Sequence, residues 1–188
     1  NQIGLEKVRK QLQMCIDSVK HGESFNINLT HNIYEGQLMD NEEPIVWNEL
    51  VLDEHWDQLV DAISGDELVT NICGIKIKNV EMTKERLAAL VAMFLSGRAT
   101  NSSTYTSFSN ANLCKEGIIS LSKLVETSSM LKIFSLCHNR IDNMDSARCL
   151  SRSIKSHIQL NHLSLKHCGL GGNPEILSVI LQSDIKYI

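Results

Sequence analysis

Hydrophobic residues along this chain follow two alternating periods. In short segments they occupy every second position, as in the pairs Phe134/Leu136 and Leu163/Leu165, which is typical of strands buried on one face. In the longer segments between them they recur at helical spacing, as in residues 87–95, where the apolar positions fall on one face. The pattern therefore predicts an α/β chain built from repeated strand and helix units.

Two segments of eleven residues are near copies of each other. Residues 131–141 (LKIFSLCHNRI) and 160–170 (LNHLSLKHCGL) both read L-x-x-[LF]-x-L-x-x-[NC]-x-[LI], with Leu136 and Leu165 lying 29 residues apart. Equivalent hydrophobic pairs recur toward the N-terminus, so that six strands are predicted. Their inward-facing pairs are Ile27/Leu29, Leu50/Leu52, Ile75/Ile77, Thr106/Phe108, Phe134/Leu136 and Leu163/Leu165.

Amphipathic helices are expected between these strands. The spacing of apolar residues predicts helices over residues 5–19, 87–95, 118–125 and 144–154, and a shorter one over 59–63. Asn173 has the chemistry of an N-cap and Pro174 suits the first helical position, so a last helix is predicted to begin at Pro174. Residues 184–188 read as the start of a further strand, which suggests that the chain is part of a longer protein.

The eleven-residue motif at this period resembles the leucine-rich repeat. With true helices between the strands, it resembles the ribonuclease-inhibitor-like class found in NOD-like receptors, Ran GTPase-activating proteins and tropomodulins. The resemblance implies a curved solenoid with a parallel β-sheet on the concave face and α-helices on the convex face. It divides the chain into an N-terminal helix that is a cap or an earlier repeat (1–23), six repeats (24–183) and the start of another (184–188).

Members of that class commonly carry Asn or Cys at the fourth conserved position of the motif. The positions here are Asn32, His55, Val80, Ala111, Asn139 and Cys168. An Asn side chain at this place can bond to backbone groups where the chain leaves the strand.

Composition excludes several kinds of function. With 18 basic and 22 acidic side chains the formal charge is −4, so binding to nucleic acid is not expected. The six cysteines contain no CxxC pair, which favours reduced thiols in a cytoplasmic protein. No apolar run approaches membrane-spanning length, so we expect a soluble chain with no membrane contact. No small-molecule substrate or cofactor is indicated.

The residues between the inward-facing pairs are predicted to face the concave side. The residues that flank the pairs are predicted to face the same side or its rim, and Tyr105, Ile133 and His162 each directly precede a pair. These three form the best candidate for a protein-binding row, because aromatic and apolar side chains contribute most to interface energy. Asp53 on a predicted second strand would lie beside Lys76 and Lys78 on the third. Mutual pairing for stability is the favoured interpretation of these charges, and recognition of a mixed-charge partner is the alternative.

His138 and His167 occupy the same repeat position and are predicted to stack within about 5 Å. With Cys137 and His162 they supply ligand types that zinc accepts, but zinc needs three or four convergent ligands and residues on a fairly flat sheet diverge. A structural or solvated histidine pair is therefore favoured, with both rings on the partner-binding face. Activation of Cys137 by His138 is disfavoured because adjacent side chains in extended chain point apart. No catalytic residue and no metal site are predicted.

Residues 96–109 are rich in small polar residues and span the longest repeat. They predict a flexible loop extension, with a strand-edge contact for a partner as the alternative.

The sequence thus predicts a non-enzymatic module that binds a protein partner through its concave face. Two other classes stay open. One is a regulatory or sensing segment of a larger switch protein, receptor-like or GTPase-activating. The other is an enzyme or metal protein.

Overall fold

The computed structural model describes residues 2–31, 50–65, 70–96 and 99–181. Helices and strands alternate along the chain, with one additional short strand and one 3₁₀ turn. The elements are α1 (Gln2–Lys20), β1 (Phe25–Thr30), α2 (Leu50–Gly65), β2 (Thr70–Lys78), α3 (Lys84–Leu95), β3 (Ala99–Asn101), β4 (Tyr105–Ser109), α4 (Lys115–Thr127), β5 (Ile133–Ser135), α5 (Met144–Ser156), β6 (His162–Ser164), η1 (Leu170–Gly172) and α6 (Pro174–Leu181).

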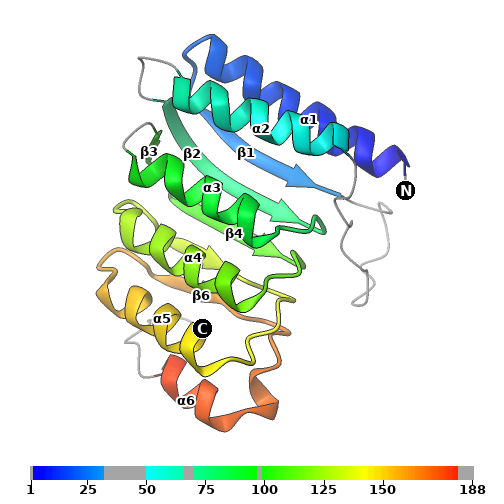
Figure 1. Cartoon of the computed structure of the whole chain (residues 1–188). Helices are drawn as coiled ribbons and strands as arrows, with labels where there is room; N and C mark the ends of the chain where they lie inside the picture. The colour runs from blue at the N-terminus through cyan, green and yellow to red at the C-terminus, as the bar shows by residue number, and fades with distance from the viewer. Residues whose placement is uncertain (1, 32–49, 66–69, 97–98, 182–188) are drawn as a thin grey trace.

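The strands form one parallel sheet that is not closed into a barrel. Its order is β1-β2-β4-β5-β6, so neighbours in the sheet follow the order of the chain, and β3 pairs with β2 outside this path. Figure 1 shows the helices side by side in one layer that covers one face of the sheet, again in chain order. None of the described helices lies on the other face. This is an α/β architecture with two layers.

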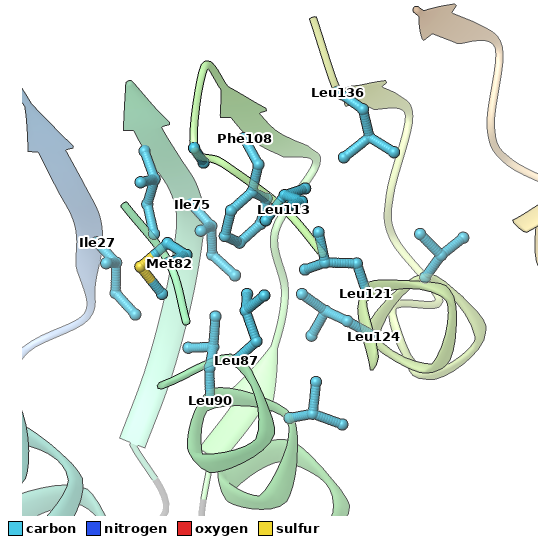
Figure 2. Close-up of a cluster of buried hydrophobic side chains, with 14 of the residues drawn as sticks. Ile27, Ile75, Met82, Leu87, Leu90, Phe108, Leu113, Leu121, Leu124 and Leu136 are labelled. Carbon is cyan, nitrogen blue, oxygen red and sulfur yellow. The ribbon is translucent and has the colours of Figure 1, made fainter. Parts of the chain in front are cut away.

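The core lies between the sheet and the helix layer. Ile27, Ile75 and Phe134 are fully buried on the helix-facing side of their strands. Figure 2 shows side chains of the sheet pointing toward leucines of α3 and α4, among them Leu87 and Leu121. Each such buried side chain contributes on the order of 1.5–3 kcal/mol through removal of apolar surface from water.

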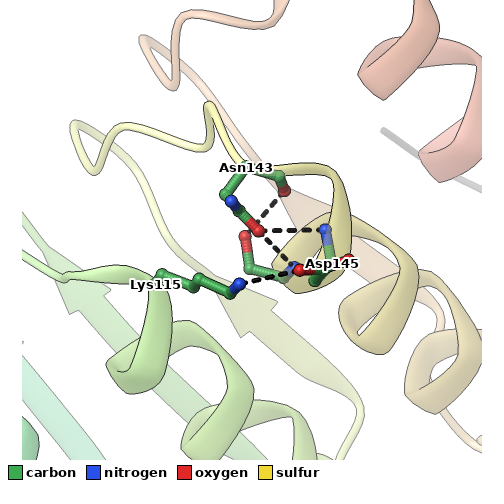
Figure 3. Close-up of polar contacts among 4 residues, drawn as sticks. Lys115, Asn143 and Asp145 are labelled. Carbon is green, nitrogen blue, oxygen red and sulfur yellow. Dashed lines mark hydrogen bonds and ion pairs between the residues drawn. The ribbon is translucent and has the colours of Figure 1, made fainter.

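Several helix starts follow from local chemistry. Asn143 accepts hydrogen bonds from the backbone N–H groups of Asp145 and Ser146 and so caps α5 (Figure 3). Lys115 Nζ lies 2.7 Å from Asp145 Oδ2 and ties α4 to α5 at their N-terminal ends. The predicted start of α6 at Pro174 is confirmed, and the side chain of Asn173 accepts from the N–H of Ile176 as an N-cap.

The predicted second strand at Leu50/Leu52 is wrong. Residues 50–65 form helix α2, and β1 pairs directly with β2, with Ile27 opposite Ile75. The reason lies in the longer pattern, since Leu52, Trp56 and residues 59 and 63 are all buried at helical spacing on one face. Two leucines two positions apart fit a strand, but the whole segment fits only a helix. The other five predicted strands are present.

The segment 96–109 is not simply a loop. Ala99–Asn101 forms β3, which pairs in parallel with the first half of β2, and Thr70 lies opposite Ala99. The hydroxyl of Ser102 donates to Asn71 Oδ1 and extends this contact. The prediction of a flexible extension is therefore wrong at residues 99–101, because pairing with the long β2 satisfies the backbone groups of those residues.

The predicted start of a further strand at residues 184–188 and the consensus position Asn32 lie outside the described residues. Among the helices that the structure describes, none combines the length and apolar character needed to cross a membrane.

Candidate functional site

The face of the sheet opposite the helices carries the candidate residues, and we refer to it as the open face. Side chains alternate along each strand, so residues next to a core position point to this face. Its members in the described strands and their immediate C-terminal extensions are Asn26, Asn28, Lys76, Lys78, Tyr105, Ser107, Ser109, Ile133, Ser135, Cys137, His162, Ser164 and Lys166.

The register of the sheet places Tyr105, Ile133 and His162 in one row. Tyr105 lies opposite Ile133, and Ile133 lies opposite His162, at the N-terminal ends of their strands. Ile133 keeps 37% of its surface exposed, whereas Phe134 next to it is fully buried against the helices. The structure therefore brings the three predicted row residues together around an exposed apolar side chain.

A second row contains one lysine, on β2, and hydroxyl groups on β4, β5 and β6. Lys76 lies opposite Asn28 on β1 and opposite Ser107 on β4, and Ser135 lies opposite Ser164 across β5 and β6. Lys76 is exposed and Lys78 is half-buried. Both lysines thus lie on the open face, as the sequence predicts.

A third row continues this register beyond the ends of β5 and β6. The N–H of Asn110 donates to the carbonyl of Cys137, and the N–H of His138 donates to that of Lys166. Because the register persists, the row runs through Lys78, Ser109, Cys137 and Lys166. Sequence reasoning does not single out Lys166, although Lys166 follows Leu165 as Lys78 follows Ile77.

The residues that follow the third row all adopt left-handed backbone. Asn79, Asn110, His138 and His167 have φ values of 55°, 49°, 58° and 59°, a region in which Asn and His are more common than most residues. The predicted stacking of His138 on His167 is confirmed, with ring centroids 4.5 Å apart and planes inclined by 15°. The Asn110 amide donates to Asn79 Oδ1, and the Asn79 amide donates to the carbonyl of His31.

Asp53 does not belong to the open face, and its prediction as a concave residue is wrong. It lies in α2, and its Oδ1 is 2.7 Å from Nη2 of Arg86 on α3. Arg86 is buried and donates also to the carbonyl of Glu81. Asp53 therefore stabilises the contact between two helices, and the predicted pairing of an acidic strand with Lys76 and Lys78 does not occur.

Asp53→Asn is expected to lower the free energy of unfolding by about 1 kcal/mol, because Arg86 loses a charged acceptor while Asp53 is partly exposed to solvent. Asp57→Asn, an exposed position on the same helix, serves as control and is expected to change it by less than about 0.5 kcal/mol. Urea unfolding followed by circular dichroism measures both. Equal effects of the two substitutions would contradict the role of the Asp53–Arg86 pair.

Cys137 is half-buried among polar groups of the open face. Its Sγ lies 3.3 Å from Ser135 Oγ and 3.1 Å from Ser164 Oγ. Burial acts to raise the pKa of the Cys137 thiol, but the two hydroxyls, a backbone hydrogen bond from Lys166 and the Lys166 charge together bring it below the ordinary value of 9.0. Burial raises the pKa of Cys15 and of Cys168 to about 11.

Alkylation by iodoacetamide should therefore reach Cys137 in the folded protein and not Cys15 or Cys168. The alkylation rate is proportional to the fraction of the thiol that is ionised. The pH at which the rate at Cys137 is half-maximal is therefore expected below 9.0. Ser164→Ala removes a donor that favours the thiolate and should move this midpoint upward, whereas Ser129→Ala should not. Peptide mass spectrometry at each pH gives the rates, and an unchanged midpoint in Ser164→Ala would rule out this cause.

No group of three or more His, Cys, Asp or Glu side chains among the described residues is placed to hold a metal ion. His138 and His167 stack, and Cys137 is hydrogen-bonded to serine hydroxyls.

No protein-family model matches the chain, and a search of curated proteins finds no match. The functional argument therefore rests on the residues of the open face.

Proposed function

We propose that this chain is a non-enzymatic protein-interaction module of the leucine-rich repeat type, close to the ribonuclease-inhibitor-like class. In this proposal the open face is the concave side of a solenoid and binds a protein partner. Strands that follow chain order, with all the described helices on one side, support the repeat assignment. The side chain of Asn139 accepts from the N–H of Ala111 and donates to the carbonyls of Phe108 and Leu136. It thus joins two successive repeats, which further supports the repeat assignment.

One observation carries the binding proposal. Ile133 is an exposed large apolar side chain on the sheet, and it lies between Tyr105 and His162 on a face that no described helix covers. Apolar and aromatic side chains on an uncovered surface with a polar surround are typical of protein-binding sites.

The cysteines support a reducing compartment. All six are free thiols, including the buried Cys15 and Cys168. A cytoplasmic location is part of the proposal, because free thiols persist where glutathione and thioredoxin keep them reduced.

Ile133→Asp is expected to weaken partner binding by roughly 30-fold or more, because a charge placed in the centre of an apolar contact is desolvated without a counter-charge. The matched control is Ile158→Asp, at a side chain that is 98% exposed in the turn between α5 and β6. Affinity capture with the wild-type protein identifies a partner by quantitative mass spectrometry. Calorimetry with that purified partner then compares both variants, after circular dichroism has shown that each is folded.

The two variants separate the possible outcomes. Loss of the same partner from Ile133→Asp but not from Ile158→Asp supports binding through the open face. Retention of full affinity by Ile133→Asp would place the contact elsewhere on the molecule and overturn the proposal.

A further inference from the structure

Charge is distributed unequally between the two faces of the molecule. Lys76 and Lys78 lie on β2, and Lys166 lies two residues after the end of β6, all on the open face. Every acidic residue that the structure describes lies outside the strands, in a helix or in a segment between elements. Among the described residues, the strands of the open face therefore carry lysines and no acidic side chain, on a chain whose formal net charge is −4.

The described side chains opposite Lys76 and Lys78 on the neighbouring strands carry no negative charge. Across the sheet, Lys76 lies between Asn28 and Ser107. Lys78 lies between Thr30 and Ser109. Among the described residues, the ion pairs join side chains of helices and of the turns beside them, and none includes Lys76, Lys78 or Lys166. Within the part of the chain that the structure describes, pairing with acidic residues thus does not account for the positions of the three lysines.

The kind of side chain on the open face changes from the N-terminal to the C-terminal ends of the strands. The first row is apolar and aromatic around Ile133, the second holds the hydroxyls of Ser107, Ser135 and Ser164, and the third has a lysine on β2 and another after β6. Lys78 and Lys166 are three strand spacings apart, which is about 14 Å. Along the strand direction, Ile133 and Cys137 are four residues apart, which is about 13 Å.

We infer that the open face binds an acidic polypeptide segment. Two carboxylate side chains of this segment pair with Lys78 and Lys166, and an apolar side chain packs on Ile133. In extended chain, which rises about 3.4 Å per residue, carboxylates about four residues apart match the separation of the two lysines. This inference rests on the proposed function, because it names the kind of partner that the same face takes.

Charge complementarity alone would also attract a nucleic acid, but the open face suits a polypeptide better. Its described strands contain no arginine, and three lysines release few counterions, so affinity for a phosphate backbone would be weak at physiological salt. The exposed Ile133 beside Tyr105 offers an apolar contact that a polypeptide side chain fills.

The test is selection of peptides from a random twelve-residue display library against the full chain at 50 mM NaCl. Enriched peptides are expected to carry acidic residues and an apolar residue, and to bind with an affinity that falls several-fold at 300 mM NaCl. The combined Lys76→Gln, Lys78→Gln and Lys166→Gln variant should bind them at least about tenfold more weakly at 50 mM NaCl. Fluorescence anisotropy with the labelled synthetic peptides measures both effects.

The control removes the same amount of charge from the helix layer. Lys7→Gln, Lys123→Gln and Lys155→Gln replace three exposed lysines of α1, α4 and α5 that take part in none of the described ion pairs. This variant is expected to bind the selected peptides within about twofold of the wild type. Because both variants change the net charge equally, a difference between them reports on the open face.

The outcomes distinguish this inference from the proposed function. Neutral or basic peptides that bind the wild type but not Ile133→Asp would overturn the acidic specificity and leave protein binding by the open face intact. Peptides unaffected by Ile133→Asp and by the open-face lysine variant would overturn both. Failure to enrich any peptide, or tighter binding of a random single-stranded DNA 40-mer than of the selected peptides, would overturn the inference of an acidic polypeptide.

Discussion

Replacing Asn139 with alanine is expected to lower the free energy of unfolding by roughly 3–5 kcal/mol, a large part of the 5–15 kcal/mol that stabilises a typical domain. The Asn139 side chain is buried, and its Oδ1 accepts from the backbone N–H of Ala111 at 2.9 Å and of Leu113 at 3.4 Å. Its amide donates to the carbonyls of Phe108, Leu136 and Cys137 at 2.7, 3.0 and 3.1 Å. Alanine would take the Oδ1 acceptor away from the buried N–H groups of Ala111 and Leu113 and would remove the donor that joins them to the strand carbonyls.

Asn161→Ala provides the control, because Asn161 is exposed just before β6. Its expected effect on the free energy of unfolding is within about 0.5 kcal/mol. Chemical unfolding followed by circular dichroism compares the two variants. If Asn139→Ala were as stable as Asn161→Ala, the hydrogen bonds that join the turns after β4 and β5 would not contribute as the structure indicates.

Phe134→Ala is expected to destabilise the protein by about 3–5 kcal/mol, through lost burial and the cavity left behind. Phe134 is fully buried between Thr106 and Leu163 of the neighbouring strands. The matched control is Ile133→Ala at the preceding residue, whose side chain points to the open face and should cost about 1 kcal/mol or less.

This pair also tests the register of the sheet. Adjacent residues of a strand face opposite sides, so a shift of one residue would exchange the roles of Ile133 and Phe134. Thermal and urea unfolding of both variants should therefore rank Phe134→Ala as far the less stable. The reverse ranking would show that β5 is paired in the wrong register.

The C-terminal half of the fold could be predicted well from the sequence. There the copied motif sets Phe134 and Leu163 at equivalent positions, and the structure pairs them as direct neighbours. Stacking of His138 on His167 followed from the same offset. These predictions succeeded because every second residue of a strand is buried and the repeat length is constant in this half. Only one register of the sheet then buries every hydrophobic pair.

The N-terminal half shows where sequence reasoning stops. Leu50 and Leu52 matched the spacing of a strand pair, and this misplaced Asp53 beside Lys76. In the structure, Asp53 projects from α2 toward Arg86. The error arose because two leucines two positions apart are compatible with an alternating strand and also with the apolar face of a helix. A short stretch of sequence therefore does not distinguish the two structures.

The sequence alone determined the alternation of strands and helices, the buried side of each C-terminal strand and the residues that point away from it. These follow from periodicity, which is a local property of the chain. Only the tertiary structure decided that β1 pairs directly with β2 and that all the acidic residues it describes lie outside the strands. Those relations depend on which strands become neighbours, and pairing is settled by burial summed over the whole sheet rather than by any single segment.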